Sequence, residues 1–244
     1  MVSIPANPAK CSSLQNIHKG SRAFVIGNGP SLAIDDLEAI KNEITFAANK
    51  IYLSFPDTSF RPTYYAAVDP VFLDNFHKQA ETVPSLKFFP IWGRAWIKES
   101  EDTYFFQEID IPKKNGFAPR FSFDLQKGLY GGFTVTFTLM QLAFYMGIRK
   151  LYLLGIDHDY AFSAKRTCHP ICGEVLVAGG ETNHFHPDYR HPGEMWTIPQ
   201  PDKQKKSYLL AKEVFETHQG QILNLSRGGK LDIFPRTNLE DILA

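Results

Sequence analysis

The sequence predicts an α/β fold: a Rossmann-like, mostly parallel twisted sheet flanked by helices, with a long His-rich lid insertion. Short apolar runs typical of buried strands alternate with segments of helical periodicity, and this alternation favours a parallel sheet. The run over residues 150–157 is nearly continuously apolar, as expected of a central strand that is buried on both faces. We therefore expect an N-terminal leader at 1–20 and a single domain at 21–244, with the lid at 158–200.

The first half of the domain is predicted to hold four strands and two helices. The strands are expected at residues 23–26, 44–49, 64–68 and 87–91. The first helix follows the first strand, with Leu32, Leu37 and Ile40 on its apolar side. The second begins at Asp69-Pro70, because aspartate suits the N-cap and proline the first helical position. Residues 92–130 contain many aromatic side chains without a sustained period, and no element is predicted there.

The second half begins with a helix over residues 134–146, which Gly147 closes as a C-terminal glycine. The apolar strand at 150–157 follows. The lid segment is rich in His, Pro and Gly and lacks periodicity, and loops longer than about 12–15 residues are usually functional. The remaining elements are expected to be a helix from Pro201 to Gly220, a strand at 221–225 and a helix at 239–243.

Composition narrows the function classes. The 244 residues include 26 Lys+Arg and 26 Asp+Glu, and a net charge of zero argues against a nucleic-acid partner held by a global basic field. No apolar run approaches the ~20 residues of a membrane span, and the polar N-terminus does not resemble a secretory signal. Three cysteines, Cys11, Cys168 and Cys172, are too few for a disulfide framework. We expect a cytoplasmic protein, or one at the inner membrane surface, and homo-oligomerisation stays open.

Small polar residues end four of the predicted strands or directly follow them: Asn28, Asn49, Asp69 and Asp157. In parallel α/β sheets, ligands bind beyond the carboxyl ends of the strands, where the strand order reverses. Each residue alone is equally well explained as a turn or helix cap. If the strand ends are neighbours, the four become candidate ligand contacts.

The turn after the first strand contains Gly27, Asn28, Gly29 and Ser31. Glycine lets the backbone approach a ligand closely, Ser31 can cap a helix, and exposed N–H groups in such a turn attract an anion. The motif is neither a G-x-x-x-x-G-K-[ST] phosphate loop nor G-x-G-x-x-G, which disfavours an ordinary nucleoside triphosphatase or dinucleotide enzyme. The alternative is a tight strand-to-helix turn with no ligand.

Two further clusters could carry chemistry. Asp157 and Asp159 form a D-x-D pattern that can hold Mg²⁺ or Mn²⁺ on nucleotide phosphates, or Asp157 can orient backbone or a ligand hydroxyl. Cys168 and Cys172 lie among several histidines and invite a zinc hypothesis, but they lack a second matching ligand pair. General base catalysis by one lid histidine is the better hypothesis, since the unperturbed pKa of ~6.5 suits proton abstraction.

The chain resembles the bacterial lipooligosaccharide sialyltransferases in four segments, and a related family in three others. The related family includes flagellar motility accessory factors and archaeal hydroxymethylpterin pyrophosphokinases. The sialyltransferase-like segments are residues 27–32 (GNGPSL), 47–50 (AANK), 69–70 (DP) and 151–157 (LYLLGID). The segments similar to the second family are 183–185 (NHF), 228–231 (GGKL) and 234–236 (FPR).

The resemblance implies a Rossmann-like glycosyltransferase that moves a sugar, such as a nonulosonate, from a CMP-activated donor to a glycan or protein hydroxyl without a metal. It places Asn28 and Asn49 on the cytidine nucleotide, with Asp69 where the family has a nucleotide-contacting Asn. Thr134 would lie near the donor. The implied partners are thus a nucleotide-sugar donor and an acceptor, and no further cofactor is required.

The same resemblance assigns the catalytic positions. Tyr160 matches a tyrosine that contacts the leaving phosphate. His184 matches the proposed base, which would deprotonate the acceptor hydroxyl. Together with Asp157, these are the candidate catalytic residues.

Two alternatives remain open. One is a hydroxymethylpterin-type pyrophosphokinase, with ATP and Mg²⁺ held by Asp69, Asp157 and Asp159. The other is a nucleotide-binding accessory module for surface-polysaccharide or flagellar assembly that does not turn its ligand over.

Overall fold

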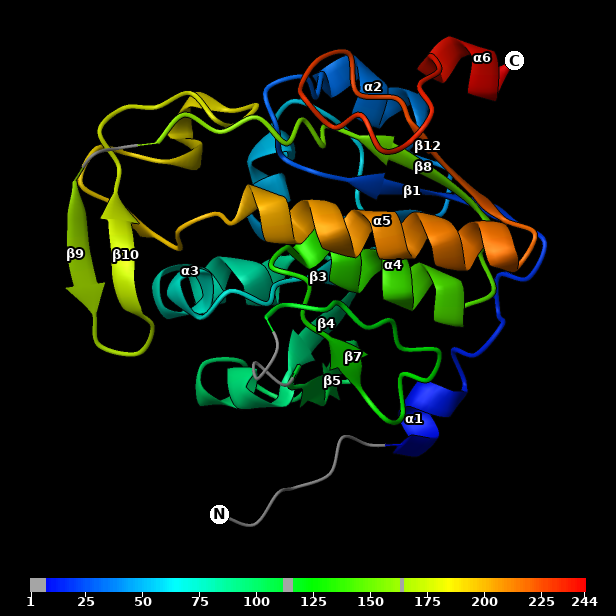
Figure 1. Cartoon of the computed structure of the whole chain (residues 1–244), viewed down its shortest axis with the longest axis horizontal. Helices are drawn as coiled ribbons and strands as arrows, with labels where there is room; N and C mark the ends of the chain where they lie inside the picture. The colour runs from blue at the N-terminus through cyan, green and yellow to red at the C-terminus, as the bar shows by residue number, and fades with distance from the viewer. Residues whose placement is uncertain (1–7, 112–115, 163–164) are drawn as a thin grey trace.

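A seven-stranded parallel sheet forms the centre of the protein (Figure 1). The computed structural model describes residues 8–111, 116–162 and 165–244. The strand order is β12-β8-β1-β2-β3-β4-β5. The strands are β1 (Arg22–Ile26), β2 (Thr45–Ala48), β3 (Tyr64–Ala66), β4 (Leu86–Pro90), β5 (Thr103–Phe106), β8 (Lys150–Leu154) and β12 (Gln221–Asn224). The predicted α/β class with a mostly parallel sheet is confirmed.

The strand order reverses between β1 and β8. From β1 the chain adds β2 to β5 on one side, and it then returns so that β8 pairs with the other side of β1. Val25 is thus in register with Phe46 of β2 on one side and Leu153 of β8 on the other. The loops after β1 and β8 consequently leave the sheet side by side, at the position where such folds bind ligands.

Helices cover both faces of the sheet. One face carries α4 (Val135–Tyr145) and α5 (Pro201–Thr217), which lie side by side in Figure 1. The other carries α2 (Ile34–Ala39), the 3₁₀ helix η1 (Asn49–Ser54), α3 (Pro70–Thr82) and α6 (Leu239–Leu243). Alternation along β1 supplies both cores, since Ala23 and Val25 join the first apolar cluster while Phe24 and Ile26 join the second.

Residues 92–130, which predicted no element, contribute a strand to the main sheet and a smaller sheet. Strand β5 is the edge of the main sheet, where it pairs with β4. The other elements around this segment are η2 (Ile91–Ala95) and the short strands β6 (Glu108–Ile109) and β7 (Leu129–Tyr130), which pair with each other. The run Thr103–Phe106 is short and buried, and a short apolar run of this kind gives too little periodicity to identify a strand.

The expected lid segment has a sheet of its own. It contains β9 (Arg166–His169), β10 (Gly173–Val177), η3 (Pro187–Tyr189) and β11 (Met195–Trp196), with strand order β11-β10-β9. Figure 1 shows the β9–β10 hairpin beside the main sheet. The described part of residues 158–200 therefore contains short strands that no periodicity predicted, and movement of this segment as a lid remains a prediction.

The described part of the expected leader, residues 8–20, packs against the domain. It contains α1 (Pro8–Ser12) and packs Cys11 and Leu14 into the main apolar cluster. The Tyr145 hydroxyl donates a hydrogen bond of 3.1 Å to the carbonyl of Cys11. Residues 1–7 lie outside the described residues. Within the described ranges, no helix has both the length and the hydrophobicity needed to cross a membrane.

Candidate functional site

Two adjoining cavities open at the carboxyl ends of β1, β2 and β8. The glycine-loop cavity is lined by Gly27, Asn28, Gly29, Asp157 and their neighbours. The larger Arg190 cavity, with a volume of about 300 Å³, is lined by Asp69, Arg190, Trp196 and others. Residues shared by both cavities join them into one cleft: Asn49, Thr134, Val135, Tyr160 and His184. All four strand-end residues singled out from the sequence therefore line this cleft.

The glycine loop is held tightly against the loop after β8. The N–H groups of Gly27 and Gly29 donate to the carbonyls of Leu154 and Gly155, both at 2.8 Å. A Cβ added at Gly27 would overlap the Gly155 carbonyl, and one at Gly29 would overlap the Asp157 carboxylate. The glycines thus allow two loops to approach each other. The sequence predicted that N–H groups in this turn attract an anion. Those of Gly27 and Gly29 are not free to do so, because the carbonyls of Leu154 and Gly155 already accept their hydrogen bonds.

Asp157 also belongs to this junction. It is 4% exposed, and its Oδ2 accepts a hydrogen bond from the Ser31 N–H at 2.9 Å. Asp159 forms an ion pair of 2.7 Å with Lys230. The two carboxylates of the D-x-D pattern thus bind different parts of the chain. In the part of the chain that the structure describes, no group of three or more His, Cys, Asp or Glu could hold a metal ion, so neither the magnesium nor the zinc hypothesis has an assembled donor set.

Two asparagines that line the glycine-loop cavity have side-chain oxygens without partners. Asn28 donates through Nδ2 to the Ala48 carbonyl at 2.9 Å, which leaves its Oδ1 buried without a partner. Asn49 has a left-handed backbone with φ of 50°, and its carbonyl accepts from the Tyr65 hydroxyl at 2.9 Å. Its Oδ1 is also buried without a partner. These two oxygens are therefore buried acceptors that no described residue satisfies.

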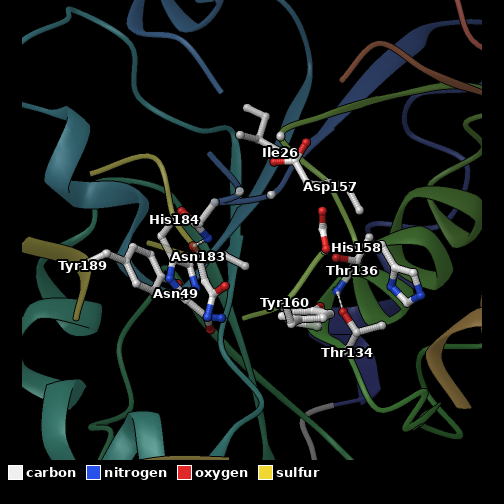
Figure 2. Close-up of a pocket in the computed structure, with 18 of the residues that line it drawn as sticks. Ile26, Asn49, Thr134, Thr136, Asp157, His158, Tyr160, Asn183, His184 and Tyr189 are labelled. Carbon is white, nitrogen blue, oxygen red and sulfur yellow. Dashed lines mark hydrogen bonds between the residues drawn. The ribbon is translucent and has the colours of Figure 1, made fainter. Parts of the chain in front are cut away.

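The opposite side of the cavity is built by α4, α5 and the loop after β8. Thr134 caps α4 by accepting the Thr136 N–H at 3.3 Å. The Tyr160 hydroxyl donates to Oε1 of Gln204 on α5 at 3.2 Å, and burial raises the pKa of this tyrosine. In Figure 2, Thr134 and Tyr160 lie on one side of the view with Asp157, and Asn49 lies on the other side with His184.

Asp69 caps α3, as its place before Pro70 predicted. Its Oδ1 accepts the Val71 N–H at 2.9 Å and the Thr197 hydroxyl at 2.8 Å. Burial raises the pKa of this carboxyl, and these hydrogen bonds oppose the rise. Asp69 lines the Arg190 cavity, while its carboxylate already stabilises the helix and binds the β11 segment.

His184 lies where the two cavities meet, on the ring of Tyr189. Lys50 fixes this pair, because its Nζ donates to the Tyr189 carbonyl at 2.6 Å and pairs with Glu194 at 2.8 Å. Burial, Arg190 and Lys50 together lower the pKa of His184 to about 2. The imidazole is consequently neutral at physiological pH, and in this environment it accepts a proton less readily than a free histidine.

Arg190 and Trp196 were not among the residues predicted from the sequence. Nε and Nη1 of Arg190 and Nε1 of Trp196 are buried without hydrogen-bond partners. The guanidinium lies over the Trp196 ring, 3.8 Å from its centroid. In the sequence these residues lie in the segment without periodicity, and only the folded chain shows that they reach the same cavity as His184.

Buried polar atoms without partners gather around this cleft. Among the described residues they are Asn28 Oδ1, Ser31 Oγ, Asn49 Oδ1, Asp157 Oδ1, His158 Nδ1, Arg190 Nε and Nη1 and Trp196 Nε1, with Ser85 Oγ in addition. Nearly all buried polar groups in folded proteins find a partner, and an unsatisfied one costs about 1–3 kcal/mol. Except for Ser85 and Ser31, each of these residues lines one of the two cavities. The cleft is therefore suited to a polar ligand that supplies both donors and acceptors.

Comparisons with known proteins agree with this fold. The chain resembles the solved structure of the Maf glycosyltransferase from Magnetospirillum magneticum AMB-1, with a TM-score of 0.53 and 16% identity. The alignment covers 93% of this chain and 37% of that protein, so the chain spans little more than a third of its length. No curated protein matches the chain. The model of the MptE-like family, described as 6-hydroxymethylpterin diphosphokinase MptE-like, matches residues 2–162. Because this match spans more than half of the sequence, the chain belongs to the MptE-like family.

Proposed function

We propose that the protein is a glycosyltransferase that moves a sugar, a nonulosonate such as sialic acid, from a CMP-activated donor to a hydroxyl of a glycan or protein. The observation that carries this proposal is the set of unpartnered buried polar atoms around one cleft at the β1–β8 reversal. The structural neighbour is a glycosyltransferase, and the residues in the cleft match those that the sialyltransferase resemblance assigns.

The glycine-loop cavity would hold the nucleotide. The amide oxygens of Asn28 and Asn49 would accept hydrogen bonds from nucleotide hydroxyl or amino groups, which would satisfy the two oxygens left without partners. Gly27 and Gly29 would contribute by keeping this side of the cavity open and fixed. Thr134 and the Tyr160 hydroxyl would lie near the phosphate, since both residues line the two cavities.

His184 would act as the general base. As the acceptor oxygen attacks the anomeric carbon, its proton would pass to a ring nitrogen of His184. The bond from the anomeric carbon to the phosphate oxygen would break, and CMP would leave with the electron pair. A base needs a pKa near the working pH, whereas Arg190 and Lys50 help to hold the pKa of His184 at about 2. An anionic donor beside these cations would offset their charge and raise the basicity of the imidazole.

A pyrophosphokinase using ATP and Mg²⁺ is the second candidate, because the matched family model is named for a pterin diphosphokinase. It needs carboxylates that converge on a metal. Asp69 accepts from Val71 and Thr197, Asp157 from Ser31, and Asp159 pairs with Lys230. These separate engagements support the transferase over the kinase.

A thermal-shift panel tests the choice. A ligand that binds only the folded state raises the melting temperature by mass action. We expect CMP and CMP-N-acetylneuraminate to raise it equally well with Mg²⁺ and with EDTA, and ATP to have little effect. Stabilisation by ATP that needs Mg²⁺, with no response to CMP, would replace the transferase with the kinase. Binding of CMP without turnover of any CMP-sugar would indicate the accessory module.

A further inference from the structure

The side of the cleft away from the glycine loop contains two side chains, Arg190 and Trp196, with N–H groups that no described residue accepts. Trp196 is 7% exposed, and its indole N–H has no acceptor among the described residues. Nε and Nη1 of Arg190 are likewise buried without an acceptor there. Both side chains line the Arg190 cavity and neither lines the glycine-loop cavity. Residues 8–111, 116–162 and 165–244 thus supply no acceptor for these three buried donor atoms, and a ligand in the cavity could supply one.

Nearby carboxylates attract the guanidinium, but no described carboxylate forms a hydrogen bond with its Nε or Nη1. Glu194, Asp69 and Glu181 all attract Arg190 electrostatically. However, Asp69 is bound by the Thr197 hydroxyl at 2.8 Å, and Glu194 by the Lys50 ammonium at 2.8 Å. Stacking on the Trp196 ring, 3.8 Å away, fixes the guanidinium without using its N–H groups. The site therefore keeps a positive charge in position and its donors unoccupied.

We infer that Arg190 and Trp196 form a carboxylate subsite, which binds the acid group of the sugar being transferred. The inference rests on the proposed function. A planar guanidinium presents its donors in a fork that matches a carboxylate, and the indole N–H adds a third donor from a different direction. A phosphate has similar chemistry, and the proposed function places the nucleotide phosphate near Thr134 and Tyr160, which line both cavities. Arg190 and Trp196 line only the Arg190 cavity, so we assign them to the acid group of the sugar, and titration with CMP alone distinguishes this group from the phosphate.

Two variants separate this role from a structural one. Arg190→Gln removes the charge and the fork, and Trp196→Phe removes only the N–H while keeping an aromatic ring under the guanidinium. Because an unpaired buried charge is costly, Arg190→Gln should leave the free protein as stable as wild type or raise its Tm by about 2–4 °C. A merely structural arginine would instead lower the Tm when replaced.

Binding is measured by calorimetric titration with four probes: CMP, CMP-N-acetylneuraminate, free N-acetylneuraminate and its methyl ester. We expect Arg190→Gln to weaken CMP-N-acetylneuraminate and the free acid about 10- to 100-fold, and Trp196→Phe to weaken them up to about tenfold. CMP should bind both variants as it binds wild type, which also shows that they fold. The methyl ester lacks the negative charge that Arg190 is proposed to bind. It should therefore have the same affinity for wild type and for Arg190→Gln.

The outcomes distinguish the subsite from the proposed function. Equal loss of CMP and CMP-N-acetylneuraminate in Arg190→Gln would assign the arginine to the phosphate and overturn the subsite. If wild-type protein binds CMP but not the free acid, the subsite is overturned and the proposed nucleotide site is supported. Acid binding that depends on Arg190, without CMP binding, would support the subsite while the CMP donor is rejected. Binding of neither would reject both.

Discussion

The imidazole of His184 stacks face to face on the phenol of Tyr189, with ring centroids 3.7 Å apart and planes 6° apart. Stacking fixes the ring plane of the candidate base. Tyr189 is itself held by the Lys50–Glu194 pair, so a buried charge network positions the proton acceptor of the proposed reaction. The predictions below follow from this arrangement and from the glycine loop that faces it.

His184→Ala should abolish sugar transfer and leave CMP affinity within about twofold of wild type. The imidazole lies at the junction of the cavities, while Asn28 and Asn49 are expected to hold the nucleotide. The rate of transfer is measured as the release of CMP from CMP-N-acetylneuraminate in the presence of an acceptor. His191→Ala, in the same segment but exposed, is the control and should keep full activity. Turnover by His184→Ala at the wild-type rate would remove this residue from the mechanism.

Stability should fall as the solution is acidified below pH ~6.5. Unfolded histidines have a pKa of ~6.5, whereas burial helps to lower the pKa of His184 to about 2 and lowers that of His158. Below pH ~6.5 the unfolded chain therefore binds protons that the native protein does not. Each such histidine removes at most about 1.4 kcal/mol of unfolding free energy per pH unit, and its stabilising effect is fully present above pH ~6.5.

Urea unfolding at pH 7.5 and pH 5 measures this dependence. His184→Gln should show a shallower loss of stability between the two pH values than wild type, and His191→Gln should match wild type. An identical slope in wild type and His184→Gln would mean that His184 is protonated as easily in the folded chain as in the unfolded one.

Breaking the Lys50–Glu194 pair should destabilise the protein. The two side chains are 5% and 16% exposed, and removing one partner of a buried pair costs about 3–5 kcal/mol because the other charge is left uncompensated. Glu194→Gln should therefore lose more stability than Lys50→Met/Glu194→Leu, in which both charges are gone. The double variant should also lose activity, since it lacks the ammonium that donates to the Tyr189 carbonyl. A double variant less stable than Glu194→Gln would contradict the charge argument.

Gly29→Ala should disrupt the nucleotide site. The added methyl group would collide with the Asp157 carboxylate, which holds the N–H of Ser31. We expect CMP affinity to fall at least about tenfold and stability to fall by about 1–3 kcal/mol, as for an overpacked core position. Gly228→Ala is the matched control, because a Cβ there would meet no atom within 4 Å. Equal CMP affinity in the two variants would show that the close approach of the loops is not needed for binding.

The sequence predicted the parallel sheet and the gathering of strand-end residues because both follow from local patterns. Strand β1 ends in four apolar residues, Ala23 to Ile26, which Gly27 follows, and parallel topology then brings Asn28, Asn49 and Asp157 to one edge of the sheet. Asp69 was recognised as a helix cap for the same reason. These features depend on residues that are neighbours in the chain or on a general rule of the fold.

What could not be predicted depends on contacts between distant segments. Arg190 and Trp196 meet only because the segment around η3 and β11 folds against the cleft, and no spacing in the sequence encodes this meeting. Likewise, the N–H groups of Gly27 and Gly29 looked available to an anion, but the carbonyls after β8, more than 120 residues later, accept them. The use of Asp157 as an acceptor for Ser31 is hidden in the same way.

We propose that the cleft at the ends of β1 and β8 binds the nucleotide of a CMP-sugar without a metal. The decisive measurement is calorimetric titration of wild-type protein with CMP in EDTA, repeated with Gly29→Ala and Gly228→Ala. Saturable binding at one site per chain is expected for wild type and Gly228→Ala, and strongly weakened binding for Gly29→Ala. Absence of CMP binding to the wild-type protein, or binding that Gly29→Ala leaves intact, would overturn the proposed nucleotide site.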